Sequence, residues 1–472
     1  MPYVIGFDTM AHYVPDTLIL MRDGVNFLSF MSLAPFIYVL LMGVTSLGVP
    51  IVISLKVLSP LLLGLLGSVT YFYANRALSW SPKKSLLVAL FATLYFVALR
   101  VSFDMLRSEL GLIFLFVTMI LLKKDENPLR NSFLLSAAML LVVFAHQLVA
   151  VLMFAVITAT VIRSFLNKDW AESRRLFLCS TPALFLFAIV VYSSVISSQI
   201  FVASDLLGRD SAGFLALFGS TSHLDLVLGT LGFLAFCYLP LLPLLVLGFR
   251  RFKGNLQLKV WIIWIFFSLS LVIISQKTFF SVHPYRWTLL LTYPLAFYAA
   301  EALSGLKPKL LKIGVGLMLA TLSLGFLLMP PEKPFFYFSQ EVVNGYIYQV
   351  PSSILQNTVS IADCQDTGNA LQWLKTKMDS SARLLTHRAF YGWALTTLND
   401  SQVVLYEYNN PNDAAKIVAQ QKIAHIYLIW WINGQGWYGQ STVQPSFEKV
   451  YQSGRIAIYR YAPANATSNK NT

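Results

Sequence analysis

Residues 52–75 read VISLKVLSPLLLGLLGSVTYFYAN, and Lys56 is the single charged residue in this stretch. A helix of about 20 mostly apolar residues is long enough to cross the hydrocarbon core of a bilayer. The whole chain has the same character, because 56% of its 472 residues are hydrophobic and 12% are charged. Soluble domains carry about 25% charged residues. The composition therefore excludes a soluble globular protein and a disordered chain, and it indicates an integral membrane protein.

Apolar runs alternate with short polar breaks as far as about residue 330. This pattern predicts an α-helical membrane protein with ten spans. The run at 30–47 is also apolar, but Pro35, Gly43 and Gly48 interrupt it. We expect it to lie against the outer membrane face rather than to span. The predicted spans are 52–75, 85–100, 105–122, 131–144, 147–163, 176–198, 226–248, 258–275, 285–303 and 310–329.

Basic residues set the orientation of these spans. Of the 24 lysines and arginines before position 330, 17 fall in alternate loops. Cytoplasmic loops carry the excess of Lys and Arg in membrane proteins, so we expect these loops inside. They also account for much of the net charge of +13 without a nucleic-acid partner. The predicted inner loops are 76–84, 123–130, 163–175, 250–259 and 307–312.

This orientation places residues 1–51, everything after 329 and all six histidines on the outer side. Side chains that can transfer protons, the histidines above all, therefore lie at the outer face of what we expect to be a cell membrane. We expect the functional site at that face. A chain that starts outside without a signal peptide is unusual. We expect the apolar start MPYVI to be the stub of a missing first span, which would be an eleventh.

The composition changes after residue 329, where the Pro-rich junction MPPEKP ends the last predicted span. Soluble-type patterning follows and predicts a small α/β domain outside the membrane. Its expected elements are a helix at 366–378, strands at 383–387, 403–408 and 425–431, a hairpin at 447–461, and a helix from Asn412 or Asp413 to Gln421. The predicted organisation is a first outer loop with an interfacial helix at 1–51, a transmembrane domain at 52–329, a junction at 330–362, an outer α/β domain at 363–463 and a disordered tail at 464–472.

Asp8 lies in the stretch GFDTMAHY, four residues before His12. A carboxylate at a membrane surface can act as a general base on an acceptor hydroxyl. With Asp16 or Asp23 it could also hold a divalent cation. The competing interpretation is that Asp8 caps a helix running to Leu20, and the residues alone favour the cap.

Arg100, Asp104, Arg107 and Glu109 place four charges in ten residues between two apolar runs. Each charge costs about 2.5–3.5 kcal/mol in lipid, so these groups must pair, reach the surface or line a cavity. A structural ion pair, either Asp104 with Arg107 or Arg107 with Glu109, and a polar wall that faces a phosphate both remain open. His146 occupies a minimal break between two short apolar runs. It either bonds to a neighbouring carbonyl or donates to a phosphate.

The stretch KTFFSVHPYRW carries Lys277, His283 and Arg286 among aromatic residues at a predicted outer boundary. The arginine fork binds phosphate oxygens in pairs, and aromatic rings suit the membrane interface. The cluster therefore fits a phosphorylated lipid headgroup. The alternative is an interfacial anchor, in which the arginine reaches out to water and Trp287 sits in the aromatic belt.

Several chemistries have no motif in this sequence. It contains no P-loop, GxSxG, HExxH or dinucleotide-binding pattern, which disfavours an ATP-driven pump and a soluble-type hydrolase. Its three cysteines show no zinc-site or disulfide spacing, and we predict no metal site from ligand patterns.

Four stretches resemble the GT-C superfamily of membrane glycosyltransferases, which includes the protein O-mannosyltransferases and the aminoarabinose transferases. GFDT (6–9) with His12 is similar to the acidic motif of the family's first outer loop. APFIY (34–38) and YFYANR (71–76) resemble its loop helix and next span. LQWLK (371–375) resembles a helix of the C-terminal domain in prokaryotic members.

The resemblance implies a GT-C fold and transfer of a sugar from a polyprenyl-phosphate-linked donor to an acceptor on the outer face. By this similarity Asp8 would be the catalytic carboxylate, and a lone carboxylate needs no metal in principle. The residues expected around the lipid phosphate are Arg107, His146, Lys277, His283 and Arg286. The expected supporting residues are His12, Asp104 and Glu109.

Two other classes of function remain open. A transporter or flippase of a lipid-linked or anionic substrate would place ionisable residues near the bilayer midplane on broken helices. The charges predicted here lie at span ends, which favours the enzyme. A non-catalytic partner protein is the third interpretation. The acceptor, whether protein, lipid or glycan, has no signal in the sequence.

Overall fold

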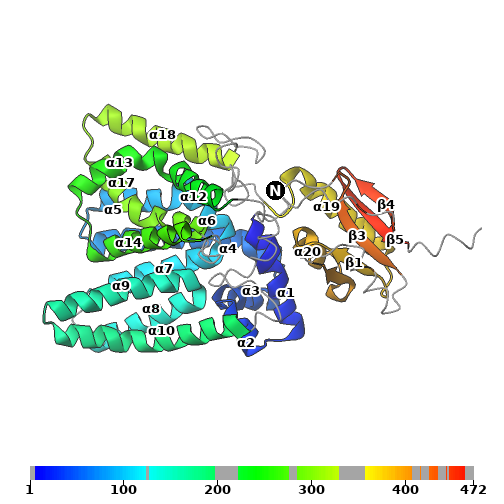
Figure 1. The fold of residues 1–472 in the computed structure, drawn as a ribbon, viewed down its shortest axis with the longest axis horizontal. Helices are drawn as coiled ribbons and strands as arrows, with labels where there is room; N and C mark the ends of the chain where they lie inside the picture. Colours follow the sequence, from blue (N-terminus) through cyan, green and yellow to red (C-terminus); the bar gives the residue numbers. More distant parts are fainter. Residues whose placement is uncertain are drawn as a thin grey trace, which may run out of the picture. The chain divides into compact units, whose positions relative to one another are not determined.

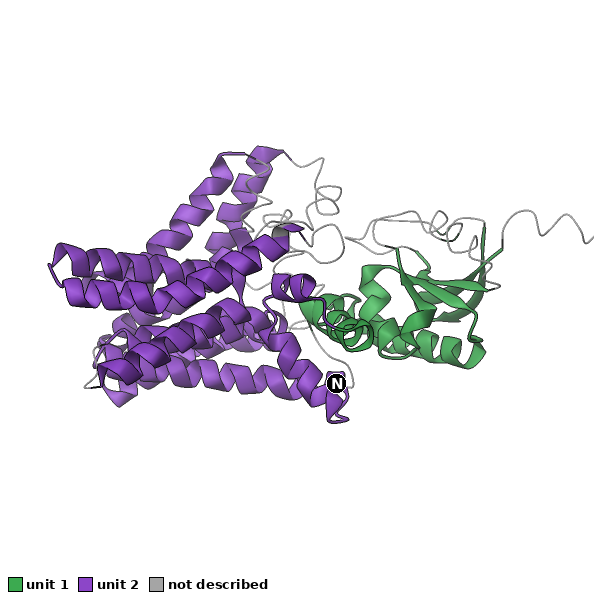
Figure 2. Cartoon of the chain, turned by 90° about the horizontal axis from the view of Figure 1, so that it is seen from below, with its two compact units in different colours: residues 1–24, 355–472 green, residues 25–354 purple. Residues whose placement is uncertain are grey.

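The computed structural model of the chain divides into two compact units, which Figure 2 colours separately. Unit 1 comprises residues 1–24 and 355–472, and unit 2 comprises residues 25–354. The structure describes residues 6–123, 127–196, 222–275, 284–328, 357–406, 425–433 and 446–462, together with Ala415 and Val443.

Unit 2 is helical throughout its described residues (Figure 1). Short π- or 3₁₀-helical turns, η2 (Tyr73–Ala77), η4 (Leu239–Leu241) and η5 (Leu271–Ile273), extend three of its helices. The helices are α2 (Phe27–Ser32), α3 (Phe36–Ser46), α4 (Ile51–Phe72), α5 (Pro82–Leu94), α6 (Phe96–Asp104), α7 (Leu106–Leu121), α8 (Pro128–Ala145), α9 (Gln147–Leu166), α10 (Trp170–Ile196), α12 (His223–Tyr238), α13 (Leu242–Arg251), α14 (Leu256–Ser270), α16 (Pro284–Leu290), α17 (Thr292–Ser304) and α18 (Lys309–Leu328).

Seven helical segments among the described residues are long and apolar enough to cross a membrane, or eight if the bent pair α5–α6 counts as one span. Each of the ten predicted spans coincides with a helix or a broken helix. The number is lower because α7 has only 16 residues, and the span predicted at 285–303 divides into α16 and α17 at Leu291. The multi-span helical fold is confirmed, whereas the predicted count of ten or eleven spans is not.

The outward faces of these helices carry large apolar side chains. Phe133 is 73% exposed, Phe185 71% and Leu310 80%. Contiguous apolar surface of this kind is rare on soluble monomers. Lipid tails are as apolar as these side chains, so a bilayer removes the cost of exposing them. The chain is therefore a multi-pass membrane protein.

The apolar run at 30–47 is divided at Ala34, which has a positive φ of 50°. α2 ends before this residue and α3 follows it. At 11 residues, α3 is shorter than the roughly 20 that a span requires. This length agrees with the expectation that 30–47 does not cross the membrane.

Unit 1 contains a five-stranded sheet in the order β2-β1-β3-β5-β4. β1 pairs in parallel with β2 and β3, whereas β5 runs antiparallel to β3 and β4. Its helices are α1 (Val14–Asp23), α19 (Ile361–Lys377) and α20 (Arg388–Leu395), with π-helical turn η1 (Thr9–Tyr13) and 3₁₀ turn η7 (Asp400–Gln402). The strands are β1 (Arg383–Thr386), β2 (Val403–Leu405), β3 (Ile426–Trp431), β4 (Phe447–Ser453) and β5 (Ile456–Tyr461).

The predicted helix at 366–378 and the five predicted strands correspond to α19 and β1 to β5, so the small α/β domain is confirmed. α20 was not expected. The helix predicted to end at Gln421 lies outside the described residues, except for Ala415.

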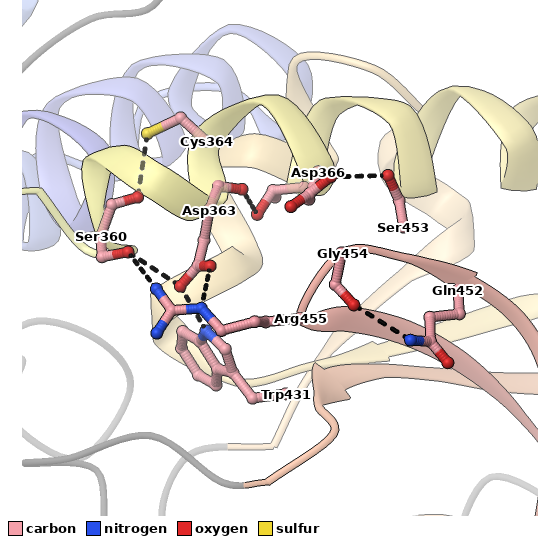
Figure 3. A network of polar contacts seen from close by, with 10 residues as sticks. Ser360, Asp363, Cys364, Asp366, Trp431, Gln452, Ser453, Gly454 and Arg455 are labelled. Carbon is pink, nitrogen blue, oxygen red and sulfur yellow. Dashed lines mark hydrogen bonds and ion pairs between the residues drawn. The ribbon is translucent and has the colours of Figure 1, made fainter.

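A buried polar network joins α19 to β3 and β5 (Figure 3). Asp363 is fully buried and accepts hydrogen bonds from Trp431 Nε1 at 3.1 Å, Arg455 Nε at 2.8 Å and Ser360 Oγ at 2.9 Å. Three donors satisfy this buried carboxylate. Gly454, with φ of +51°, forms the turn between β4 and β5, where a Cβ would collide with Asp366. These contacts fix the helix on the sheet.

The segment predicted as one outer loop at 1–51 is divided between the two units at Gly24. Gly24 ends α1 with a φ of +80°, a conformation that glycine adopts without strain. The residues before it belong to unit 1 because η1 and α1 pack against α20. The acidic stretch around Asp8 therefore belongs to the same compact unit as the C-terminal domain.

Candidate functional site

The acidic stretch of unit 1 forms a short helix with a π-helical turn. Asp8 precedes η1, and α1 follows directly with Pro15 in its first turn. Proline has no N–H for the helical ladder, and its ring crowds the carbonyl four residues earlier. A widened turn accommodates it, and such turns are frequent at functional sites.

Asp8 itself has helical backbone angles, φ −61° and ψ −28°, and its side chain makes no capping hydrogen bond. A capping residue has an extended backbone and accepts from an N–H of the first turn. The interpretation of Asp8 as a helix cap is therefore wrong. Asp8 as a residue is only partly buried.

α20 holds this segment at two points. Arg388 Nη2 lies 3.2 Å from Nδ1 of His12. One turn further along α20, a Cβ on Gly392 would collide with the backbone carbonyl of Met10. Only glycine allows the two helices to approach so closely.

The far end of α1 has a third attachment. Arg22 lies 3.9 Å from Asp400 and forms a closer ion pair with its neighbour Asp23. Burial raises the pKa of Asp400, and Arg22 partly opposes that shift. Burial also raises the pKa of Tyr391 on α20. The segment is thus anchored along its whole length within unit 1.

His387 caps α20, since its Nδ1 accepts a hydrogen bond from the Ala389 N–H at 3.2 Å. Burial first, and the neighbouring Arg388 second, lower the pKa of His387 to about 4. A neutral imidazole is the form that can accept at Nδ1. His387 therefore acts as a neutral cap at pH 7.

A second group of polar side chains is buried in unit 2, where α6, α7 and the α8–α9 junction meet. Arg100 and Asp104, on successive turns of α6, form an ion pair. Arg107 Nη1 donates to the Leu33 carbonyl at 2.7 Å. The structure therefore pairs Asp104 with Arg100, a partner that the sequence analysis did not name.

His146 has an extended backbone between α8 and α9 and is 1% exposed. Its Nδ1 accepts from the Val149 N–H, so the ring proton resides on Nε2. Nε2 lies 3.1 Å from Ser108 Oγ. His146 is thus a helix cap, a role the sequence did not indicate, and it ties α7 to the α8–α9 junction.

Glu109 is fully buried in this cluster. Neither of its carboxylate oxygens has a hydrogen-bond partner among the described residues. A buried polar group left unsatisfied costs about 1–3 kcal/mol, and more when charged. Glu109 is therefore a buried carboxyl group that no described residue satisfies.

The predicted aromatic and cationic cluster is only partly described. Arg286 lies in α16, half-buried, and its Nε donates to Tyr285 Oη at 2.9 Å. α16 packs against α6. Lys277 and His283 lie outside the described residues. Among the residues predicted around the phosphate, the structure brings Arg107 and His146 onto adjoining elements.

Trp430 and Trp431 are 4% and 1% exposed and belong to the core of the sheet. Within the described ranges, no group of three His, Cys, Asp or Glu side chains is placed to hold a metal ion.

The sequence did not indicate that Arg388 and Gly392 contact the acidic stretch around Asp8. The heptapeptide AFYGWAL after Arg388 has apolar residues at helical spacing, and this signal could have predicted α20. No local signal pairs it with His12, because the two residues are 376 positions apart.

Comparison with known proteins gives a structural match. No known protein family and no curated protein matches the sequence. The fold is similar to the crystal structure of ArnT from Cupriavidus metallidurans bound to undecaprenyl phosphate, with a TM-score of 0.57 and 13% sequence identity. The match covers 98% of this chain and 95% of the ArnT chain. The chain therefore has a fold similar to that of this ArnT structure, and the expected multi-span helical membrane fold with a small α/β domain is confirmed.

Proposed function

We propose that this chain is a membrane glycosyltransferase that uses a polyprenyl-phosphate-linked sugar. The observation that carries the proposal is the similarity of fold to ArnT over nearly the whole length of both chains. That ArnT structure holds undecaprenyl phosphate, the lipid that such a donor would leave behind. The acceptor is unknown.

In the proposed reaction an acceptor hydroxyl attacks the anomeric carbon of the sugar. The bond from that carbon to the phosphate oxygen breaks, and the polyprenyl phosphate leaves with the electron pair. Asp8 takes the hydroxyl proton as general base. Support for this role comes from the place of Asp8, which is only partly buried and directly precedes the π-helical turn η1.

Cations would balance the charge that develops on the leaving phosphate. Arg107 and Arg286 are the described arginines we propose for this role, with Lys277 and His283. His146 is proposed with them because its ring lies 3.1 Å from Ser108 Oγ, and Ser108 is the residue next to Arg107. Asp104 and Glu109 would shape the same polar region, and His12 would support Asp8.

The positive-inside distribution supports a reaction on the outer face of the cytoplasmic membrane, with the C-terminal domain extracytoplasmic. A divalent cation at the acidic residues is kept as a proposal to be tested by addition of EDTA. Loss of transfer with EDTA, restored by Mg²⁺ or Mn²⁺, would establish it.

One observation favours a transporter instead. The breaks between α5, α6 and α7 lie beside buried ionisable groups, and Glu109 has no hydrogen-bond partner among the described residues. Broken helices with ionisable residues are typical of transport sites. The two functions differ in whether a covalent bond to the sugar changes.

The test uses the purified chain in sealed lipid vesicles with radiolabelled polyprenyl-phosphate sugars and a membrane extract as acceptor source. We expect label to move covalently to an acceptor, and we expect Asp8→Asn to abolish this transfer. Glu448→Gln, a change to an exposed carboxylate elsewhere in unit 1, is the control. Label that crosses the bilayer still attached to its lipid would support a transporter and contradict the proposal.

A further inference from the structure

The N-terminal segment and α20 contact one another although 376 positions separate His12 from Arg388. Gly392 adds a second contact, because its Cα lies directly against the Met10 carbonyl. Met10 and His12 both belong to the π-helical turn that follows Asp8. α20 therefore packs against the turn that directly follows Asp8, the proposed base.

The Arg388–His12 contact has a defined chemistry. A guanidinium can only donate hydrogen bonds, so Nδ1 of His12 must accept. The imidazole is then neutral, with its proton on Nε2. His12 follows Asp8 by four residues, a spacing that places both on one face of the helical turn.

We infer that Arg388 is a positioning residue for Asp8. Its guanidinium fixes the orientation and tautomer of His12, and His12 fixes the turn from which the Asp8 carboxylate projects. Through Arg388, the C-terminal domain therefore sets the position of the Asp8 carboxylate. This inference rests on the proposed role of Asp8.

The surroundings of Arg388 suit this role. Its neighbour His387 stays neutral because burial and the adjacent guanidinium lower its pKa to about 4. α20 is thereby capped by an uncharged side chain, and Arg388 is the only cation in this helix. The ion pair of Arg22 with Asp400 secures α1 independently, so loss of Arg388 should loosen the turn without releasing the whole segment.

The first measurement needs no substrate. Backbone hydrogen exchange is followed by mass spectrometry in the full chain, in lipid, for peptides covering residues 9–23. We expect Arg388→Ala to speed exchange there about tenfold, the factor that loss of one charge-assisted hydrogen bond gives. Gly392→Ala should do the same through the backbone clash. Arg460→Ala, which removes a surface ion pair with Glu448, is the control and should leave these peptides unchanged.

The second measurement reads the tautomer. In protein labelled with ¹⁵N-histidine, and with His12 assigned by His12→Gln, we expect Nε2 protonated and Nδ1 unprotonated in the parent. Arg388→Ala should give a mixture of tautomers. Arg388→Lys, which keeps a cationic donor, should restore the parent spectrum.

The third measurement uses the labelled polyprenyl-phosphate sugar that supports transfer. Arg388→Ala should lower kcat about 100-fold, the scale of an ångström-sized misplacement, with the KM for the donor unchanged. Arg388→Lys should recover most of the rate. If hydrogen exchange in the strands of the sheet is also faster in Arg388→Ala, the kcat and KM of Arg388→Gln, which keeps a neutral donor, are compared with those of the parent instead.

The outcomes separate the inference from the function on which it rests. Unchanged exchange at 9–23 in both Arg388→Ala and Gly392→Ala would overturn the inference, whatever Asp8→Asn does. Faster exchange with an unchanged kcat would overturn it as well. Full transfer by Asp8→Asn would instead remove Asp8 as the base while the exchange result stood.

Discussion

Two buried carboxyl groups, one in each unit, differ in their hydrogen bonding. Asp363 in the C-terminal domain accepts hydrogen bonds from an arginine, a tryptophan and a serine (Figure 3). Glu109 in the helical unit is buried as completely, yet no described residue donates a hydrogen bond to it. A satisfied buried carboxylate stabilises a fold, whereas an unsatisfied one destabilises it. The difference indicates that Asp363 stabilises its unit, and we expect that Glu109 adds no stability to the helical unit.

Removal of the satisfied carboxylate should have the largest effect on stability. We expect Asp363→Ala to lower the free energy of unfolding of the C-terminal domain by about 3 kcal/mol, because it leaves the buried Trp431 N–H without its acceptor. Urea unfolding of the full chain in lipid, followed by tryptophan fluorescence, measures the loss. Glu448→Gln, which removes a surface ion pair with Arg460, should cost about 1 kcal/mol or less. Equal effects of the two changes would break the comparison.

Acid tests the same domain through His387. Its pKa in the folded state is about 4, below the unfolded value near 6.5, so the unfolded chain takes up a proton first as pH falls. The stability it supports is complete above about pH 6.5 and should decline by up to about 3 kcal/mol as pH falls to 4. Urea unfolding at a series of pH values checks this slope. His387→Asn keeps a helix cap without a titrating ring and should flatten the slope. A slope identical in both proteins would assign the acid sensitivity elsewhere.

The smallest expected change in stability belongs to the unsatisfied carboxylate. Glu109→Gln should leave thermal stability unchanged or raise it by about 1 kcal/mol, because it replaces a buried carboxyl group to which no described residue donates a hydrogen bond. Sugar transfer should nevertheless fall, as expected when a residue is kept for activity at a cost in stability. Thermal unfolding in lipid and the transfer assay measure the two effects together. A marked loss of stability would mean that Glu109, like Asp363, is structural.

Much of the fold could be predicted from the sequence because its signals are local. Apolar runs marked the described helices from α3 to α18, and short apolar segments marked the five strands of the small sheet. The number of spans could not be predicted, because the breaks at Tyr95 and Leu291 lie inside continuous apolar runs. A pattern of apolar residues does not report backbone angles such as the extended ψ of 137° at Tyr95.

The candidate site was less accessible to prediction. The charges from Arg100 to Glu109 were identified by their cost in lipid, but the pairing of Arg100 with Asp104 required the structure. The residues alone favour a helix cap for Asp8, because aspartate before a helix usually is one, and only the resemblance to a known family indicates a catalytic role. The attachment of its turn to Arg388 and Gly392 is a contact between distant parts of the chain, which no local pattern encodes.

The most direct test of the account is the rate of sugar transfer by Asp8→Asn, measured beside Glu448→Gln at saturating donor with donor affinity determined separately. We predict a kcat about 10²–10⁴-fold lower in Asp8→Asn than in the control, with the same donor affinity, as expected for loss of a general base. A kcat equal to that of Glu448→Gln would contradict the central claim that Asp8 carries the chemistry.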